Sequence, residues 1–117
     1  MAWEVEFTAE FETWWGDLNP DQQEALTARV GLLSEFGPGL GRPVVDRIEG
    51  SRHAHMKELR ASKDGALRVL FAFDPRRTAI LLLGGDKSGQ WIAWYARAIP
   101  EADWLFDEHL RELRREG

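Results

Sequence analysis

The sequence contains no cysteine, which excludes disulfide bonds and thiolate metal sites. It also lacks any apolar run of about 18 residues, the length that a membrane-spanning helix needs. The N-terminus alternates apolar and acidic residues, whereas a secretory signal peptide begins with basic residues followed by an apolar run. With 117 residues the chain has the size of one domain. We therefore expect a single domain, residues 1–117, located in the cytoplasm.

Charge is distributed unevenly along the chain, whose formal net charge is −5. Residues 1–24 contain seven acidic side chains and no lysine or arginine, residues 25–100 carry a net +5, and residues 101–117 carry a net −3. A basic central segment between two acidic ends can indicate a face that binds anions such as nucleic acid. Acidic helices that are simply well solvated would give the same pattern.

The first third of the chain predicts a strand followed by a helical hairpin. Residues 3–7 alternate apolar and acidic side chains, the period of a half-buried strand. Thr8 can cap a short helix that ends near Gly16. Residues 19–22 combine an asparagine cap, a proline in the first turn and a capping-box glutamine, so we expect a second helix there that ends at Gly37.

The rest of the chain predicts strands and then helix. We expect a weak strand and then an antiparallel meander of three strands, with an Asp-Gly hairpin turn at residues 63–65. An exposed loop, a short helix and a final helix should follow. The ranges are 44–48, 55–60, 66–73 and 78–83 for the strands, 84–89 for the loop, and 91–98 and 100–114 for the helices. The fold class is therefore α+β, with helices on one face of the sheet and the other face partly open to solvent.

No standard catalytic motif is present in the sequence: it has no GxSxG, P-loop, GxGxxG or HExxH. His53 and His55 are two residues apart, so both would lie on one face if they belonged to a strand. A metal site needs a third ligand, for which Glu58 or Asp86 could serve, but the spacing does not require it. Exposed strand histidines are the simpler interpretation, and we expect no metal.

Cations gather around the predicted meander. Arg68 lies on the strongest strand and should point away from its most apolar face. Lys57 and Arg60 lie on opposite parities of their strand, so strict alternation separates them. Lys87 follows the third strand of the meander, and Tyr95 comes within two helical turns. On these residues alone, a solvated basic surface with Tyr95 in the core is the simpler interpretation.

Several segments together are similar to a known family. Their order and spacing resemble the phage Gp49-like/HigB branch of the RelE/ParE toxin superfamily over roughly residues 40–110. The segments are His55-Met56-Lys57-Glu58-Leu59-Arg60, residues 67–75, residues 79–89, Trp91, Trp94-Tyr95, Ile99-Pro100, Ala102-Asp103 and Glu108-His109-Leu110.

The resemblance implies a RelE-like fold, in which an N-terminal strand and two-helix hairpin pack on a twisted antiparallel sheet, with a C-terminal helix. It implies the toxin of a type II toxin-antitoxin system, paired with an antitoxin that is often a helix-turn-helix protein. Many such toxins are endoribonucleases that cleave mRNA on the ribosome without metal or cofactor. Alternatives within the superfamily are a ParE-like inhibitor of a protein target such as DNA gyrase, and an inactive module that only binds its antitoxin.

The resemblance also implies roles for particular side chains. Lys57 or Arg60 would hold phosphates, Arg68 would stabilise the transition state, Lys87 and Tyr95 would complete the site, and His55 would be an acid or base. The net acidity of this chain departs from the basic character typical of RelE toxins. The hypothesis requires Arg68 and Lys87 to reach one exposed concavity. It fails if they lie on opposite sides of the molecule or are buried in pairs with carboxylates.

Overall fold

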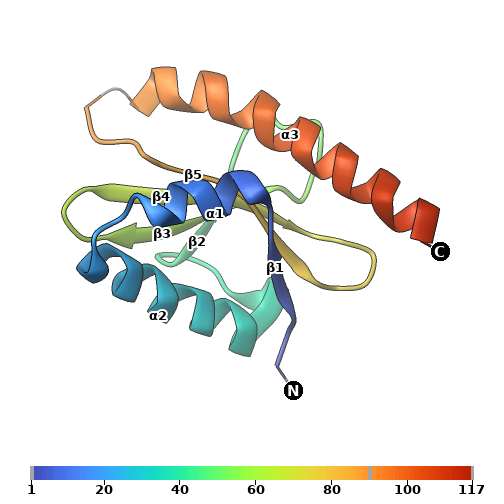
Figure 1. The fold of residues 1–117 in the computed structure, drawn as a ribbon, viewed down its shortest axis with the longest axis horizontal. Helices are drawn as coiled ribbons and strands as arrows, with labels where there is room; N and C mark the ends of the chain where they lie inside the picture. The colour runs from blue at the N-terminus through green and yellow to red at the C-terminus, as the bar shows by residue number, and fades with distance from the viewer. Residues whose placement is uncertain (1, 90, 117) are drawn as a thin grey trace.

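A five-stranded sheet lies between two layers of helix in the computed structural model, which describes residues 2–89 and 91–116 (Figure 1). The strand order is β1-β5-β4-β3-β2. Neighbouring strands are antiparallel except for β1 and β5, which are parallel, so the sheet is mixed rather than wholly antiparallel. The strands are β1 (Val5–Phe7), β2 (Val45–Arg47), β3 (Lys57–Ser62), β4 (Ala66–Phe73) and β5 (Ala79–Asp86). The predicted α+β class is confirmed.

The N-terminal helical hairpin begins and ends where its capping residues predict. Helix α1 (Ala9–Gly16) starts after Thr8, whose hydroxyl accepts a hydrogen bond from the backbone N–H of Phe11 at 3.0 Å. Helix α2 (Pro20–Phe36) starts with the complete capping box of Asn19 and Gln22. It leads into the 3-10 turn η1 (Gly37–Gly39). These caps satisfy backbone donors that a helix start leaves free.

One face of the sheet packs against α1 and α2. Leu59, Val69 and Phe71 from the central strands meet Phe11 and Leu33 from the two helices in one buried cluster. Alternation along β3 and β4 sends every second side chain to this face. The intervening side chains, among them those of the functional site described below, therefore point to the opposite face.

A single helix, α3 (Trp91–Glu116), covers most of that opposite face, which we had expected to be partly open. The two predicted helices are continuous through Pro100. A proline inside a helix removes one backbone hydrogen bond. Here Ala98, Ile99 and Ala102 are buried against the sheet on both sides of the proline. We attribute the continuity to this packing.

The segment predicted as a loop after the last strand is also different, because Gly84, Gly85 and Asp86 belong to β5. A Cβ atom on Gly84 would lie 2.1 Å from the ring of Trp14, and one on Gly85 would lie 2.0 Å from the ring of Trp94. The two glycines are thus where indole rings contact the two faces of the strand.

Within the described ranges, no helix is long and apolar enough to cross a membrane.

Candidate functional site

A cleft of about 370 Å³ lies beside the N-terminal turns of α3. Its walls come from the ends of β2 and β3, from the loop after β5 and from α3. The residues that line it are Arg47, Ile48, Glu49, Glu58, Arg60, Lys87, Trp91, Tyr95 and Ile99. Three of these side chains are cationic, and the cleft thus collects positive charge from segments far apart in the sequence.

Glu58 is the buried centre of this site, with only 2% of its side chain exposed. Its Oε1 accepts a hydrogen bond from the hydroxyl of Tyr95. Its Oε2 accepts one from Nε of Arg60 at 2.7 Å and lies 3.8 Å from Nε of Arg68. One carboxylate therefore holds a phenol and a guanidinium directly, with a second guanidinium beside it.

Strand register explains this convergence. Glu58 and Arg60 are two residues apart on β3 and share a face, and Arg60 is the direct partner of Arg68 on β4. Two guanidinium groups placed opposite each other repel, so a carboxylate on the same face stabilises the pair. Arg60 has a second carboxylate partner, because its Nη2 lies 3.0 Å from Oδ2 of Asp46 on β2.

The pKa values of two side chains in this site, Arg60 and Tyr95, are raised. Burial opposes the charge of Arg60, but its hydrogen bond to Glu58 and the charges of Glu58 and Asp46 raise its pKa above the ordinary value. Burial and then the hydrogen bond to Glu58 raise the pKa of Tyr95 to about 12. The phenol is therefore protonated at neutral pH, and its O–H group donates a hydrogen bond to the carboxylate of Glu58.

Lys87 brings a further cation to the site from the end of β5. Its Nζ lies 5.8 Å from the ring centroid of Tyr95 and 5.9 Å from that of Trp91. These distances are in the range of cation–π attraction. The ammonium group is thus held beside the two aromatic rings of α3 at the mouth of the cleft.

Four of the six predicted site residues come together: Arg60, Arg68, Lys87 and Tyr95. Lys57 lies on the opposite face of β3, as alternation requires, and its Nζ donates to the carbonyl of Pro38 at 3.3 Å. His55 is exposed in the turn before β3, which begins at Lys57 rather than at residue 55. The structure therefore places neither Lys57 nor His55 in the cleft.

Arg68 is on the expected side of the sheet, but it is largely buried beside a carboxylate, which counts against a direct role in binding RNA. It lies on the same side of the sheet as the cleft, but only 11% of its side chain is exposed and it is next to Glu58. Its Nη1 donates to the carbonyl of Leu67 at 2.8 Å, while its buried Nε makes no hydrogen bond. Arg68 therefore supports the site from behind, whereas Arg60 and Lys87 face the cleft.

Sequence reasoning gave no catalytic role to Arg47, Glu58 or Trp91, which line this cleft. Glu58 was considered only as a third metal ligand, although its i, i+2 spacing to Arg60 is the pattern of a same-face ion pair on a strand. Trp91 carried no distinguishing signal among six tryptophans, because only the fold brings it beside Lys87.

The two histidines considered as a metal pair are not on one strand face. They lie in the turns before β3, where Nε2 of His53 contacts Oδ1 of Asp107 at 2.8 Å. Burial opposes the charge of Asp107, but hydrogen bonds from Arg52 and His53 lower its pKa. Within residues 2–89 and 91–116, no group of three or more histidines and carboxylates is arranged to hold a metal ion.

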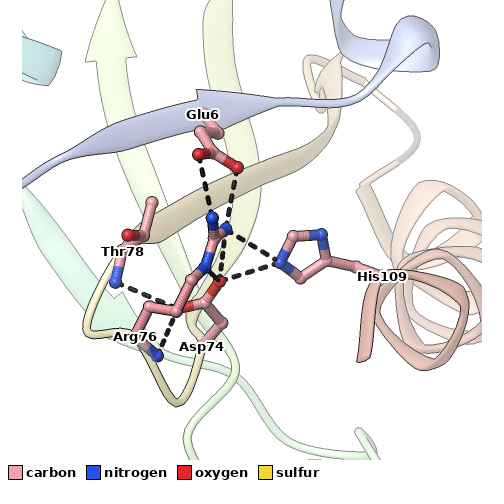
Figure 2. Close-up of polar contacts among 5 residues, drawn as sticks. All are labelled: Glu6, Asp74, Arg76, Thr78 and His109. Atoms are coloured by element: carbon pink, nitrogen blue, oxygen red, sulfur yellow. Dashed lines mark hydrogen bonds and ion pairs between the residues drawn. The ribbon is translucent and has the colours of Figure 1, made fainter. Parts of the chain in front are cut away.

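A second buried carboxylate, Asp74, lies at the far end of β4 (Figure 2). Its Oδ2 lies 2.8 Å from Nε2 of His109 on α3 and accepts hydrogen bonds from the guanidinium of Arg76. Its Oδ1 accepts from the backbone N–H groups of Arg76 and Thr78, and Arg76 also pairs with Glu6 on β1 at 2.9 Å. This cluster joins β1, the β4–β5 turn and α3.

A family model described as "Phage derived protein Gp49-like" matches residues 13–107, which include Glu58 and its partners and also Asp74 and Arg76. The chain belongs to the Gp49-like family. The Gp49-like segment thus covers the second half of α1, all of α2, strands β2 to β5 and α3 as far as Asp107.

Two relatives from Mycobacterium tuberculosis agree with the family assignment. The protein named "Putative toxin HigB3" is 50% identical over 103 residues, which cover 84% of this Gp49-like chain and 90% of the relative. The protein named "Putative toxin HigB2" is 45% identical over 114 residues, covering 93% of this chain but 57% of that longer protein.

Solved structures of RelE toxins share the fold. The isolated Escherichia coli RelE toxin matches with a TM-score of 0.61 and 13% identity, over 84% of this chain and 99% of RelE. The RelBE2 toxin-antitoxin complex from Mycobacterium tuberculosis matches with a TM-score of 0.55 and 19% identity, over 74% of this chain and 99% of that one. At these identities the likeness establishes the RelE fold of the Gp49-like chain.

Proposed function

We propose that this chain is the toxin of a type II toxin-antitoxin system, acting in the cytoplasm as an endoribonuclease that cleaves mRNA on the ribosome. The relatives named as HigB toxins support the toxin assignment. The observation that carries the nuclease assignment is the cleft, where Arg60, Lys87 and Tyr95 meet from three different elements around one buried carboxylate.

The reaction needs positive charge and a path for a proton. Attack of a ribose 2′-oxygen on the neighbouring phosphate builds negative charge on the phosphorane, which fixed cations stabilise. Arg60 and Lys87 face the cleft and would hold the phosphate oxygens. Arg68, nearly buried behind them, would help to hold the Glu58 carboxylate in place. This chemistry uses no metal or cofactor, as the family resemblance implies.

Tyr95 and Glu58 together would move the proton. Because Tyr95 already donates its hydrogen bond to Glu58, the phenol can pass its proton to the carboxylate while it takes the proton of the 2′-hydroxyl. The 2′-oxygen then bonds to phosphorus, the bond to the 5′-oxygen breaks, and the 5′-oxygen takes a proton from water. The products are a 2′,3′-cyclic phosphate and a free 5′-hydroxyl.

The cellular partner would be a cognate antitoxin. Complexes of RelE with RelB are among the solved structures that share this fold. The resemblance to the HigB branch suggests a helix-turn-helix antitoxin for this chain. A small helix-turn-helix gene beside the gene for this protein would support that pairing.

Expression with and without the neighbouring gene's product, followed by mapping of mRNA 5′ ends, tests the proposal. We expect cuts inside translated codons that disappear in Arg68→Ala and Lys87→Ala variants. Lys57→Ala is the matched control, because this cation lies on the other face of β3. Loss of cleavage in the control, or cleavage that survives in both site variants while they remain folded, would reject the assigned site.

One observation favours a second candidate function. Arg60 is already paired with Glu58 and Asp46, and Arg68 lies beside Glu58. Cations paired in this way suit a protein-binding surface better than a phosphate site. A non-enzymatic ParE-like inhibitor of a protein such as DNA gyrase would arrest growth and leave mRNA intact. An inactive antitoxin-binding module would not arrest growth.

A further inference from the structure

Trp91 is an aromatic side chain left in water at a charged cleft. It is the first residue of α3, 52% of it is exposed, and it lines the cleft together with Arg47, Arg60 and Lys87. Exposing so large an apolar ring is unfavourable unless a ligand covers it. The proton path and the phosphate-binding cations described above do not use this residue.

The ring is held in place although it is exposed. It makes an edge-to-face contact with Tyr95 one helical turn further on, with ring centroids 6.3 Å apart and planes at 79°. Nζ of Lys87 lies 5.9 Å from its centroid. A ring fixed in this way loses little side-chain entropy when a flat ligand stacks on it.

We propose that Trp91 is the platform on which one nucleobase of the RNA stacks next to the scissile phosphate. The inference rests on the proposed function for the identity of the substrate. A cationic groove that follows the backbone, combined with an aromatic ring for the base, is the general arrangement of single-strand binding sites. Lys87 lies within 6 Å of both aromatic rings. It can therefore contact a backbone phosphate while the attached base lies on Trp91.

The charge around Trp91 separates this role from protein docking. Trp104 lies on the same helix and is 56% exposed, but it is outside the cleft. Among residues 2–89 and 91–116 no lysine or arginine lies over its ring, in contrast to Trp91. Trp104 is therefore a matched control with the same exposed indole and without the cationic surroundings.

The test measures binding of a short single-stranded oligoribonucleotide that carries 2′-O-methyl groups and so cannot be cleaved. A second set of the same oligonucleotides lacks one base at each position in turn. Fluorescence anisotropy of a labelled strand gives the affinity of wild type, Trp91→Ala, Trp91→Phe and Trp104→Ala for each. Circular dichroism confirms that every variant is folded.

We expect Trp91→Ala to weaken binding about 5- to 150-fold, the range for loss of one stacked base. Trp91→Phe should restore most of the affinity, and Trp104→Ala should bind like wild type. Removal of one particular base should weaken wild type and leave Trp91→Ala unchanged, because both changes remove the same contact.

Equal losses from base removal in wild type and Trp91→Ala would overturn the platform, as would an unchanged affinity of Trp91→Ala or the absence of binding by wild type. Mapping of mRNA 5′ ends with the same proteins tests the proposed function separately. Binding that depends on Trp91 without any mRNA cleavage would retain the platform and reject the nuclease. Cleavage by wild type that continues unchanged in Trp91→Ala would retain the nuclease and reject the platform.

Discussion

Glu58 and Asp74 are both buried carboxylates that meet a side chain from α3, but their surroundings differ. Asp74 directly follows β4, and both of its oxygens accept hydrogen bonds, Oδ1 from backbone N–H groups and Oδ2 from the side chain of Arg76. Glu58 lies on β3 next to an open cleft, and the buried Nε of Arg68 beside it has no hydrogen bond. Tyr95 and His109 are 14 residues apart, about 21 Å along one helix.

The two buried carboxylates, Glu58 and Asp74, therefore have different roles. Satisfied hydrogen bonds around a buried charge stabilise a fold and leave nothing for a ligand to gain. A cluster with an unused donor and an open side retains the capacity to bind. The Asp74 cluster therefore fastens α3 to the sheet, and the Glu58 cluster is where chemistry can occur. The three predictions below test this division.

The largest expected effect is on stability, from Asp74→Ala. Removing the carboxylate leaves His109 and two backbone N–H groups without their partner. We expect the free energy of unfolding to fall by about 3 kcal/mol, as is typical when one partner of a buried charged cluster is removed. Urea denaturation followed by circular dichroism measures this change.

The variant should retain mRNA cleavage per folded molecule, because Asp74 lies outside the cleft. A stable Asp74→Ala protein, or one that is folded but unable to cleave, would contradict the division between the two clusters.

The next effect is on reactivity, from Tyr95→Phe. The phenylalanine keeps the ring contacts with Trp91 and Trp94 and loses only the hydroxyl that donates to Glu58. We expect cleavage to slow by about 100-fold or more, the range for loss of a positioned proton-transfer group. Stability should change by only about 1 kcal/mol.

His109→Gln is the matched change at the other cluster, and it should lower stability while cleavage is maintained. The division would be wrong if Tyr95→Phe lowered stability more than His109→Gln and both cleaved at the wild-type rate.

The smallest effect is in the pH dependence of stability. Burial opposes the charge of Asp74, but hydrogen bonds from His109 and Arg76 lower its pKa below 3.8. A lowered folded-state pKa adds stability that is fully present above the unfolded pKa and is lost as pH falls through the folded value. The stability gap between wild type and Asp74→Ala should therefore narrow below about pH 4.

Asp107, whose pKa is also lowered, is present in both proteins and contributes equally to each. Urea denaturation at pH 6, 4 and 3 measures the gap, and a gap that stayed constant down to pH 3 would show that Asp74 is not stabilised in its charged form.

Local signals in the sequence predicted much of the fold. The caps at Thr8 and Asn19 and the turn at residues 63–65 depend on neighbouring residues, and helix starts and the β3–β4 hairpin are as expected. The bounds of β4 at Ala66–Phe73 also agree, because a continuous apolar run between turn signals defines them.

The errors occur where long-range packing overrides local preference. Gly84 and Gly85 favour a loop by themselves, but contact with Trp14 and Trp94 makes them strand residues. Pro100 usually marks a helix start, yet burial of the residues around it continues α3 through this position.

The site, like the fold, was predictable only where the signal lies within a single element. Strand parity separated Lys57 from Arg60 and placed Arg68 on the correct face. The partnership of Glu58 with Tyr95, from positions 37 residues apart, depends on how α3 crosses the sheet. Periodicity along a single element carries no information about that crossing.

For the proposed nuclease, the pairing of carboxylates with arginines around Glu58 would also affect how RNA is met at a distance. Glu58 and Asp46 together balance Arg60 and Arg68, and the molecule has a net charge of −5, so long-range attraction of RNA would be weak. RNA would therefore associate slowly, and its affinity would come from short-range contacts inside the cleft. Such a nuclease would be selective because of slow recruitment as well as its chemistry.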